Sequence, residues 1–240
     1  MLYLIGIGLD CKDISLNGLE AVKKCKKLYL ENYTSIGCSK ENIEKLINKK
    51  VILANRELIE NKSYEILKEA KKNNIGILVY GDPLSATTHI NYLIECKKLK
   101  IKFKAIHSVS ILTIIGETGL SLYNFGKTTS IPFNNKNIIT PITVIKDNLN
   151  FGLHTLILLD LDPENKKFLN IKDALEYLSR NNFNSKIIVC SCLGTNKQDI
   201  KYNTIENLKK IKFNNYPQCL IIPGKLHFME EEALELFCRN

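Results

Sequence analysis

Residues 81–89 read Gly-Asp-Pro-Leu-Ser-Ala-Thr-Thr-His, and the interpretation of the whole chain depends on them. They follow an apolar run, residues 75–80, that is typical of a buried parallel strand, and we expect them to open a helix ending near Lys98. Gly81 permits a tight turn, and Pro83 suits a helix start. Asp82 then either caps that helix or points into the crevice past the strand ends, where open α/β sheets bind ligands.

Strands and helices alternate on both sides of this stretch. Further strands are expected at residues 1–8, 28–30, 51–53 and 101–107, and helices at residues 15–26, 40–48 and 64–73. This alternation is typical of βαβ units, whose right-handed crossovers place helices on both faces of a mostly parallel sheet. The first part of the chain is therefore predicted to be an α/β domain.

The composition changes around residues 108–133, which are rich in Ser, Thr and Gly. We expect a domain junction here, giving an N-terminal domain of residues 1–111 and a C-terminal domain of residues 112–240. In the second half, strands are expected at residues 153–161, 186–193 and 217–222. Helices are expected there at residues 141–148, 171–181, 204–211 and 229–237.

Composition limits the possible partners. The 240 residues are 45% apolar and carry a formal net charge of +9, which is compatible with an acidic or nucleic-acid-bearing partner. The lysines, however, are scattered in pairs along expected helix faces, as on a solvated surface. No apolar run reaches about 20 residues, so we expect no membrane span.

The cysteine pattern favours a reduced, cytosolic protein. We find no signal peptide, no C-x-x-C pair and no histidine spacing that would complete a zinc site. We therefore expect free thiols at all eight positions: Cys11, Cys25, Cys38, Cys96, Cys190, Cys192, Cys219 and Cys238.

The first candidate site is the turn Gly6-x-Gly8 after the first strand. A dinucleotide site requires G-x-G-x-x-G there and an acid about 20 residues on. Cys11 stands in place of the third glycine, whereas Glu31 closes the second strand as a ribose-binding acid would. A tight βα turn is favoured, and a conventional nucleotide site stays open.

Nucleophilic catalysis is the second candidate. Ser85, Thr87, Ser108 and Ser110 lie near two histidines in the sequence, His89 and His107. No G-x-S-x-G elbow is present, and no acid is placed by the sequence to orient either histidine. We interpret His89 as a packing residue, disfavour a hydrolase and expect no metal, because ligand spacing is lacking.

Polar turns remain at strand ends in both halves, at residues 81–89, 160–163, 193–195 and 223–227. Their shared location predicts one ligand held between two α/β domains. Chemistry that needs no protein acid, base or metal fits such a site. Methyl transfer from a sulfonium donor is an example, because the protein mainly aligns nucleophile, methyl and sulfur.

Several motifs together resemble the diphthine synthase family of the tetrapyrrole-methylase superfamily. They lie in order at residues 3–9, 33–35, 81–89, 106–111, 118–120, 123–127, 152–156 and 223–227. Gly-Asp-Pro alone would indicate only the superfamily. The added Ala-Thr-Thr-His, the Tyr-Asn-Phe-Gly-Lys segment and the Gly-Lys-Leu-His segment narrow the resemblance to this family.

The resemblance implies two α/β domains, the first with a mostly parallel sheet and the second with a mixed sheet, and a ligand cleft between them. It implies S-adenosylmethionine as methyl donor and S-adenosylhomocysteine as product. The implied acceptor is the amino group of a modified histidine on translation elongation factor 2, which becomes diphthine. A cytoplasmic homodimer, with no direct nucleic-acid or membrane partner and no catalytic side chain, completes this expectation.

The family's donor-binding positions carry over by motif to both halves of the chain. They are Leu9, Asp82, Ser85, Ser110, Ile111, Leu159, Leu193 and His227. Residues 190–194, Cys-Ser-Cys-Leu-Gly, depart from the alanine/arginine-rich segment that the family more often shows before this glycine. The donor-binding role of Leu193 therefore has the least support from the motif. For Asp82 we add a physical argument: a buried carboxylate needs hydrogen-bond donors, which the ligand offers.

Two alternatives stay open. A methylase of the same fold could act on a precorrin-type tetrapyrrole, although residues 123–127 and the His227 motif argue against it. A non-catalytic nucleotide- or RNA-binding module would instead use the Gly6-x-Gly8 turn and the positive charge, and its binding would depend steeply on salt.

Overall fold

The computed structural model describes residues 1–238, which fall into two compact units. The first unit comprises residues 1–112 and 163–165, and the second comprises residues 113–162 and the chain from residue 166 onward. Each unit has a sheet and a hydrophobic core of its own. The α/β class with a parallel first sheet and a mixed second sheet, predicted from the sequence, is confirmed.

The first unit is built on a five-stranded parallel sheet in the order β3-β2-β4-β1-β5. Its strands are β1 (Leu2–Gly6), β2 (Lys27–Glu31), β3 (Ile52–Ala54), β4 (Ile75–Val79) and β5 (Phe103–Ile106). The central strands β1 and β4 are buried along their whole length, as their continuous apolar sequences require. Because β1 lies between β4 and β5, the loops that follow these three strands meet at one edge of the sheet.

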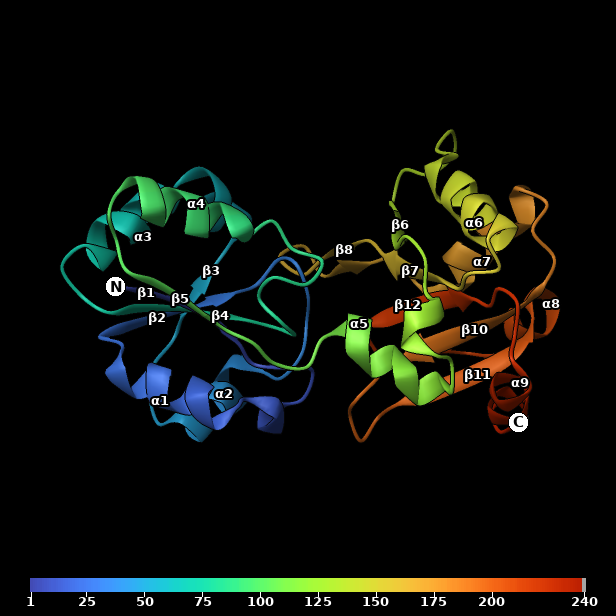
Figure 1. The fold of residues 1–240 in the computed structure, drawn as a ribbon, viewed down its shortest axis with the longest axis horizontal. Helices are drawn as coiled ribbons and strands as arrows, with labels where there is room; N and C mark the ends of the chain where they lie inside the picture. Colours follow the sequence, from blue (N-terminus) through green and yellow to red (C-terminus); the bar gives the residue numbers. More distant parts are fainter. Residues whose placement is uncertain (239–240) are drawn as a thin grey trace. The chain divides into compact units, whose positions relative to one another are not determined.

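Helices cover both faces of this sheet (Figure 1). On one face lie α1 (Leu16–Lys24) and α2 (Lys40–Ile47), and on the other lie α3 (Ser63–Ala70) and α4 (Ile90–Lys98), with a short π-helix, η2 (Glu57–Asn61), before α3. Each helix buries an apolar stripe in one of two clusters on opposite sides of the sheet. A short 3-10 helix, η1 (Cys11–Asp13), follows β1 directly.

The second unit has a mixed five-stranded sheet in the order β11-β10-β12-β7-β6. Its strands are β6 (Thr129–Ile131), β7 (Thr155–Leu159), β10 (Lys186–Ser191), β11 (Asp199–Thr204) and β12 (Gln218–Ile222). Only the β6–β7 pair is parallel among the pairings within the described residues of this sheet. A two-residue pair, β8 (Leu161–Asp162) with β9 (Lys167–Phe168), forms a small separate hairpin.

One face of the second sheet packs against α6 (Thr140–Asn150), α7 (Ile171–Arg180) and α8 (Ile205–Leu208) around the fully buried Tyr177. The unit also contains α9 (Phe228–Glu235) and the 3-10 helices η3 (Ile115–Thr118) and η4 (Leu122–Asn124). The short helix α5 (Ile111–Ile114) begins just before the division between the units.

Two groups of expected elements differ from the structure. Residues 81–89 open no helix, because the chain makes turns until α4 begins at Ile90. Ala86 adopts a positive φ of 57°, which interrupts any helix through this stretch. Strands β6 and β11 were missed, because their short, polar sequences lack the apolar runs that predicted the other strands.

Candidate active site

Two glycine turns meet at the edge of the first sheet where β1 and β4 end. Gly8 and Gly81 exchange backbone hydrogen bonds of 2.8 and 3.2 Å, and both have φ of +74°, which a side chain would strain. A Cβ at Gly6 would lie 2.7 Å from the Gly81 carbonyl oxygen. The glycines therefore allow two loops that are about 70 residues apart to approach closely.

Gly81 is also the point at which predicted donor-binding residues of the first unit converge. A Cβ built there would contact Leu9 Cδ2 and Ser110 Cα, each at 3.9 Å. Ser110 is buried, and Ile111 follows it as the first residue of α5. Leu9 is half-buried, and its N–H donates to Asp13 Oδ2 at 3.0 Å.

Asp82 is buried beside this junction and accepts hydrogen bonds at both oxygens. Its Oδ1 accepts from Leu84 N at 2.9 Å and from Ser85 Oγ at 3.2 Å. Its Oδ2 accepts from Ser108 N at 3.2 Å and lies 2.8 Å from His107 Nδ1. The argument that a ligand must supply the partners of this carboxylate is therefore wrong, and Asp82 caps no α-helix.

The contact between Asp82 and His107 corrects a second expectation. The sequence offered no acid to orient either histidine, because 25 residues separate these two. Strand order brings them together, since β4 and β5 flank β1 and their following loops meet. Burial opposes ionisation of Asp82, but the hydrogen bonds from Leu84, His107 and Ser108 outweigh it and lower the pKa of the carboxyl. Asp82 is thus an anion that holds an imidazole.

His89 has the packing role that the sequence predicted. Its ring is buried, and neither ring nitrogen has a hydrogen-bond partner within the described residues. The ring packs edge-on against Tyr33, with 6.4 Å between the centroids. Burial lowers the pKa of His89, so the imidazole is neutral at neutral pH.

The conventional dinucleotide site is wrong for two structural reasons. Strand β4 separates β1 from β2, whereas the dinucleotide fold pairs its first two strands directly. Glu31 is fully buried, and its Oε1 accepts from Tyr33 N and Thr34 N, both at 2.6 Å. Its carboxylate therefore stabilises the loop after β2, although burial raises its pKa.

The predicted donor-binding residues of the second unit lie at two edges of its sheet. Leu159 ends β7 and packs in the core, and Leu193 lies in the turn after β10. The register places both at one edge, because β7 and β10 each run antiparallel to β12. His227 follows β12 at the opposite edge and is exposed. Within this unit, the structure brings together Leu159 and Leu193 but not His227.

A buried hydrogen bond between His154 and Glu230 supports the loop that carries His227. Glu230 lies 3.2 Å from His154 Nε2 and accepts from Ser121 N at 2.8 Å and from His227 N at 2.9 Å. The Gly224 N–H donates to His154 Nδ1 at 2.8 Å, so the ring hydrogen is on Nε2 and points at Glu230. Burial raises the pKa of Glu230, but these hydrogen bonds outweigh it and lower the pKa to about 2.

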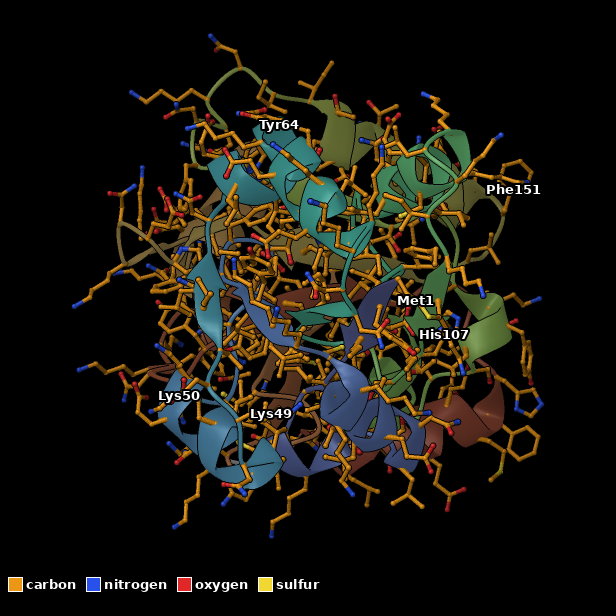
Figure 2. All side chains as sticks on the ribbon, turned by 90° about the vertical axis from the view of Figure 1, so that its left-hand side faces the viewer. Met1, Lys49, Lys50, Tyr64, His107 and Phe151 are labelled. Carbon is orange, nitrogen blue, oxygen red and sulfur yellow. A yellow bond between two sulfur atoms is a disulfide. The ribbon has the colours of Figure 1, made fainter. Side chains whose placement is uncertain are left out.

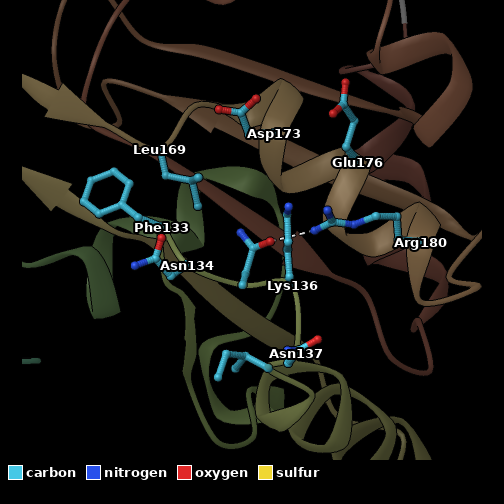
Figure 3. A pocket seen from close by; sticks show the side chains of 10 residues that line it. Phe133, Asn134, Lys136, Asn137, Leu169, Asp173, Glu176 and Arg180 are labelled. Carbon is cyan, nitrogen blue, oxygen red and sulfur yellow. Dashed lines mark hydrogen bonds between the residues drawn. The ribbon is translucent and has the colours of Figure 1, made fainter.

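A surface pocket of the second unit contains none of the predicted residues (Figure 3). It has a volume of about 460 Å³ and is lined mainly by residues 133–138 and by side chains of α7. Arg180, one of its cations, donates to Asn135 Oδ1 at 2.6 Å across the pocket. No predicted site residue lines it, so we assign it no chemistry.

Two cysteines differ from the expectation of reduced thiols. Cys11 in η1 and Cys38 before α2 form a disulfide with 5.4 Å between their Cα atoms, and η1 packs against α2. The expectation is therefore wrong for this pair, because the fold closes their separation of 27 residues. The other six cysteines carry free thiols.

Residues 1–238 contain neither a cluster of metal ligands nor a membrane-spanning helix. No group of three or more His, Cys, Asp or Glu side chains in this range is arranged to hold a metal ion. No helix in the same range has the length and apolar character needed to cross a membrane.

Comparison with known proteins gives one consistent family. Residues 1–209 match the family described as Tetrapyrrole (Corrin/Porphyrin) Methylases. The chain is 42% identical to diphthine synthase of Methanocaldococcus jannaschii over the full length of both. It is 37% identical to a probable diphthine methyl ester synthase of Arabidopsis thaliana, covering 99% of this chain and 98% of the relative.

Solved structures agree with this result. A crystal structure of a diphthine synthase superposes with a TM-score of 0.93 at 36% identity, covering 99% of this chain and 95% of the other. A putative diphthine synthase from Entamoeba histolytica gives a TM-score of 0.89 at 33% identity, covering all of this chain and 99% of the other.

Proposed function

We propose a function from one established premise: the chain belongs to the diphthine synthase family of tetrapyrrole methylases and is a methyltransferase of diphthamide biosynthesis. The proposal is that S-adenosylmethionine is the methyl donor. The acceptor is the amino group of the modified histidine of translation elongation factor 2, and the product is diphthine. The observation that carries the proposal is the convergence of Leu9, Asp82 and Ser110 around Gly81 in such a chain.

The loops around Gly81 leave room beside its backbone. A Cβ at Gly81 would project into the space between Leu9 and Ser110, so the glycine leaves this space open. In our proposal, Leu9, Ser85, Ser110 and Ile111 contact the donor here. Leu159, Leu193 and His227 are proposed donor contacts from the second unit.

When bound, the sulfonium donor supplies an activated methyl group and its own leaving group. The protein's part is to hold the acceptor amine in line with the methyl carbon and sulfur, and to exclude water from them. Asp82 contributes by fixing the loop at residues 81–85, because its Oδ1 accepts from Leu84 and Ser85 within that loop. In this role the Asp82 carboxylate needs no hydrogen-bond donor from the ligand, because the protein supplies its partners.

Incubation of elongation factor 2 bearing the unmethylated precursor with the enzyme and S-adenosylmethionine tests the proposed function. Mass spectrometry should show one or more methyl groups, each adding 14 Da, on the peptide that carries the modified histidine. A precorrin substrate in a parallel reaction should gain none. Methylation of the precorrin, or an unchanged peptide, would refute the proposal.

Replacing Asp82 tests the donor site separately. Asp82→Ala removes the carboxylate that accepts hydrogen bonds from the loop at residues 81–85 and from Ser108. Affinity for S-adenosylmethionine, measured by calorimetry, should therefore fall at least tenfold. The matched control is Asp147→Ala, which removes an exposed acid from α6. Equal affinities of the two variants for S-adenosylmethionine would show that Asp82 does not support the donor site.

We further propose that the enzyme acts in the cytoplasm, where translation factors are found, and as a homodimer. Its positive charge of +9 would favour encounter with an acidic protein surface, and such encounter weakens with added salt. Sedimentation of the purified chain tests the dimer directly.

A further inference from the structure

Asp82 and His107 form an unequal pair in which a buried acid holds an exposed imidazole. Asp82 is 7% exposed, whereas the His107 side chain is 68% exposed. His107 lies just past the carboxyl end of β5, and its position is labelled in Figure 2. The loop that begins with it leads directly to Ser110 and Ile111, two of the proposed donor contacts.

The pairing fixes which nitrogen of His107 is free. Asp82 Oδ2 is 2.8 Å from His107 Nδ1, and the carboxylate can only accept, so the ring hydrogen is on Nδ1. Nε2 then carries a lone pair, and it has no hydrogen-bond partner within residues 1–238. A histidine with one nitrogen held by a carboxylate and the other open to solvent is the arrangement of a general base.

The proposed reaction gains rate from such a group. The acceptor is an amine, and an amine attacks only through its lone pair, which protonation occupies. A model α-amino group has a pKa of about 7.7–8.0, so most of it is protonated at neutral pH. Each methyl transfer to an ammonium releases one proton, and a base beside the nucleophile can receive it at the moment of attack.

We propose that His107 is the general base of the methyl transfer, with Asp82 as its positioning residue. This inference rests on the proposed function. The amine proton moves to His107 Nε2, the nitrogen lone pair forms the N–C bond to the methyl group, and the C–S bond breaks with its electron pair going to sulfur. Solvent then takes the proton from the exposed imidazole, which returns to its starting tautomer.

The charged groups around His107 come from three elements. Asp82, after β4, contacts the ring directly. Asp13 of η1 lies nearby, because its carbonyl oxygen accepts from Ser108 Oγ at 2.9 Å, but its Oδ2 is engaged by Leu9 N and Asp10 N. Lys104, on β5, is exposed. Asp82 is thus the anion that stabilises an imidazolium at this position.

His107→Gln tests the assignment, because glutamine can still donate to Asp82 but cannot accept the proton. The value of kcat for methylation of precursor-bearing elongation factor 2 should fall about 100-fold. Affinity for S-adenosylmethionine should stay within threefold by calorimetry. Lys104→Gln, on the strand that precedes His107, is the matched control and should behave like the wild type.

Two further measurements separate a base from a structural residue. In the smaller variant His107→Ala, added imidazole should restore activity, because the position is exposed. Long-range ¹H–¹⁵N NMR of the donor-free protein should show His107 protonated on Nδ1. The fraction of this tautomer should fall in Asp82→Asn.

The possible results are decisive. An active wild type with His107→Gln within twofold of its kcat at every pH overturns the role of His107 and leaves the proposed function standing. An Nε2-protonated tautomer in the wild type also overturns the role. A wild-type enzyme that transfers no methyl group overturns the proposed function, and the base assignment with it.

Discussion

Glu230→Gln is the most informative perturbation of the second unit, because Glu230 joins the start of its own helix to two other segments. Its carboxylate contacts the N–H groups of Ser121 and His227, at 2.8 and 2.9 Å, and His154 Nε2 at 3.2 Å. Glutamine has a single acceptor oxygen, and its NH₂ group would face one of these donors. The variant therefore loses a charge and leaves a buried donor without an acceptor.

The magnitude follows from the pKa. A fall in the pKa from 4.5 to about 2 at a residue that is 2% exposed corresponds to at most about 3.5 kcal/mol, at about 1.4 kcal/mol per pKa unit. Hydrogen bonds to charged groups contribute a similar amount, about 1.5–3 kcal/mol. We expect Glu230→Gln to lose about 2–3 kcal/mol of unfolding free energy at pH 7.

The pH dependence has a definite sign. Because the folded-state pKa of Glu230 is lowered, its stabilisation is complete above about pH 4.5 and is lost as the pH falls toward 2. The difference between wild type and variant should therefore be constant from pH 7 to pH 5.5. It should shrink below pH 4.5, where the carboxyl of the unfolded wild-type chain begins to take up a proton.

Urea unfolding and hydrogen exchange together measure the effect. Exchange of peptides covering residues 117–125 and 222–232 reports the second unit alone, so the two units need not unfold together. Glu231→Gln removes the neighbouring exposed charge and should change stability by less than about 0.5 kcal/mol. Equal losses in the two variants, or a difference that grows as the pH falls, would refute the reasoning.

Two further predictions concern the backbone and the thiols. Gly119→Ala should lose about 2–3 kcal/mol in thermal unfolding, because φ is +84° and the new Cβ would lie 2.3 Å from Ala233 Cβ. Gly116→Ala, where the nearest atoms lie at 3.6 Å, should stay within about 1 kcal/mol of wild type, and equal effects of the two would contradict the steric argument. Thiol titration of the unfolded, unreduced chain should count six thiols, and eight would show that the disulfide is absent in solution.

The sequence predicts most of the architecture because buried strands carry apolar runs. Strands such as β1 and β4 are apolar throughout, since a parallel sheet is covered on both faces. Strand β11, at a sheet edge, reads Asp-Ile-Lys-Tyr-Asn-Thr and gives no such signal. The helix start after Gly81 was misplaced because Pro83 suits a first helical turn, whereas the turn conformation depends on contacts with other loops.

The candidate site was only partly predictable for a related reason. Motifs identify residues along the chain, but the partner of a side chain depends on strand order. The sequence places no acidic residue near His107, whereas the fold places Asp82 beside it, because β1 lies between β4 and β5. The same strand order removes Glu31 from a nucleotide site, because it places β4 between β1 and β2. Neither the Asp82–His107 contact nor the separation of Glu31 from the turn after β1 can be read from the spacing of residues along the chain.

The central position of β1 has a consequence for synthesis on the ribosome. Its neighbours β4 and β5 follow about 70 and about 100 residues later in the chain. At 5–20 residues per second, the nascent apolar strand waits about 5–20 s for its second neighbour. Until β4 is made, Leu2–Gly6 has no neighbouring strand to pair with, so chaperones and slower translation between residues 7 and 79 would affect the yield of folded protein more than changes after β5.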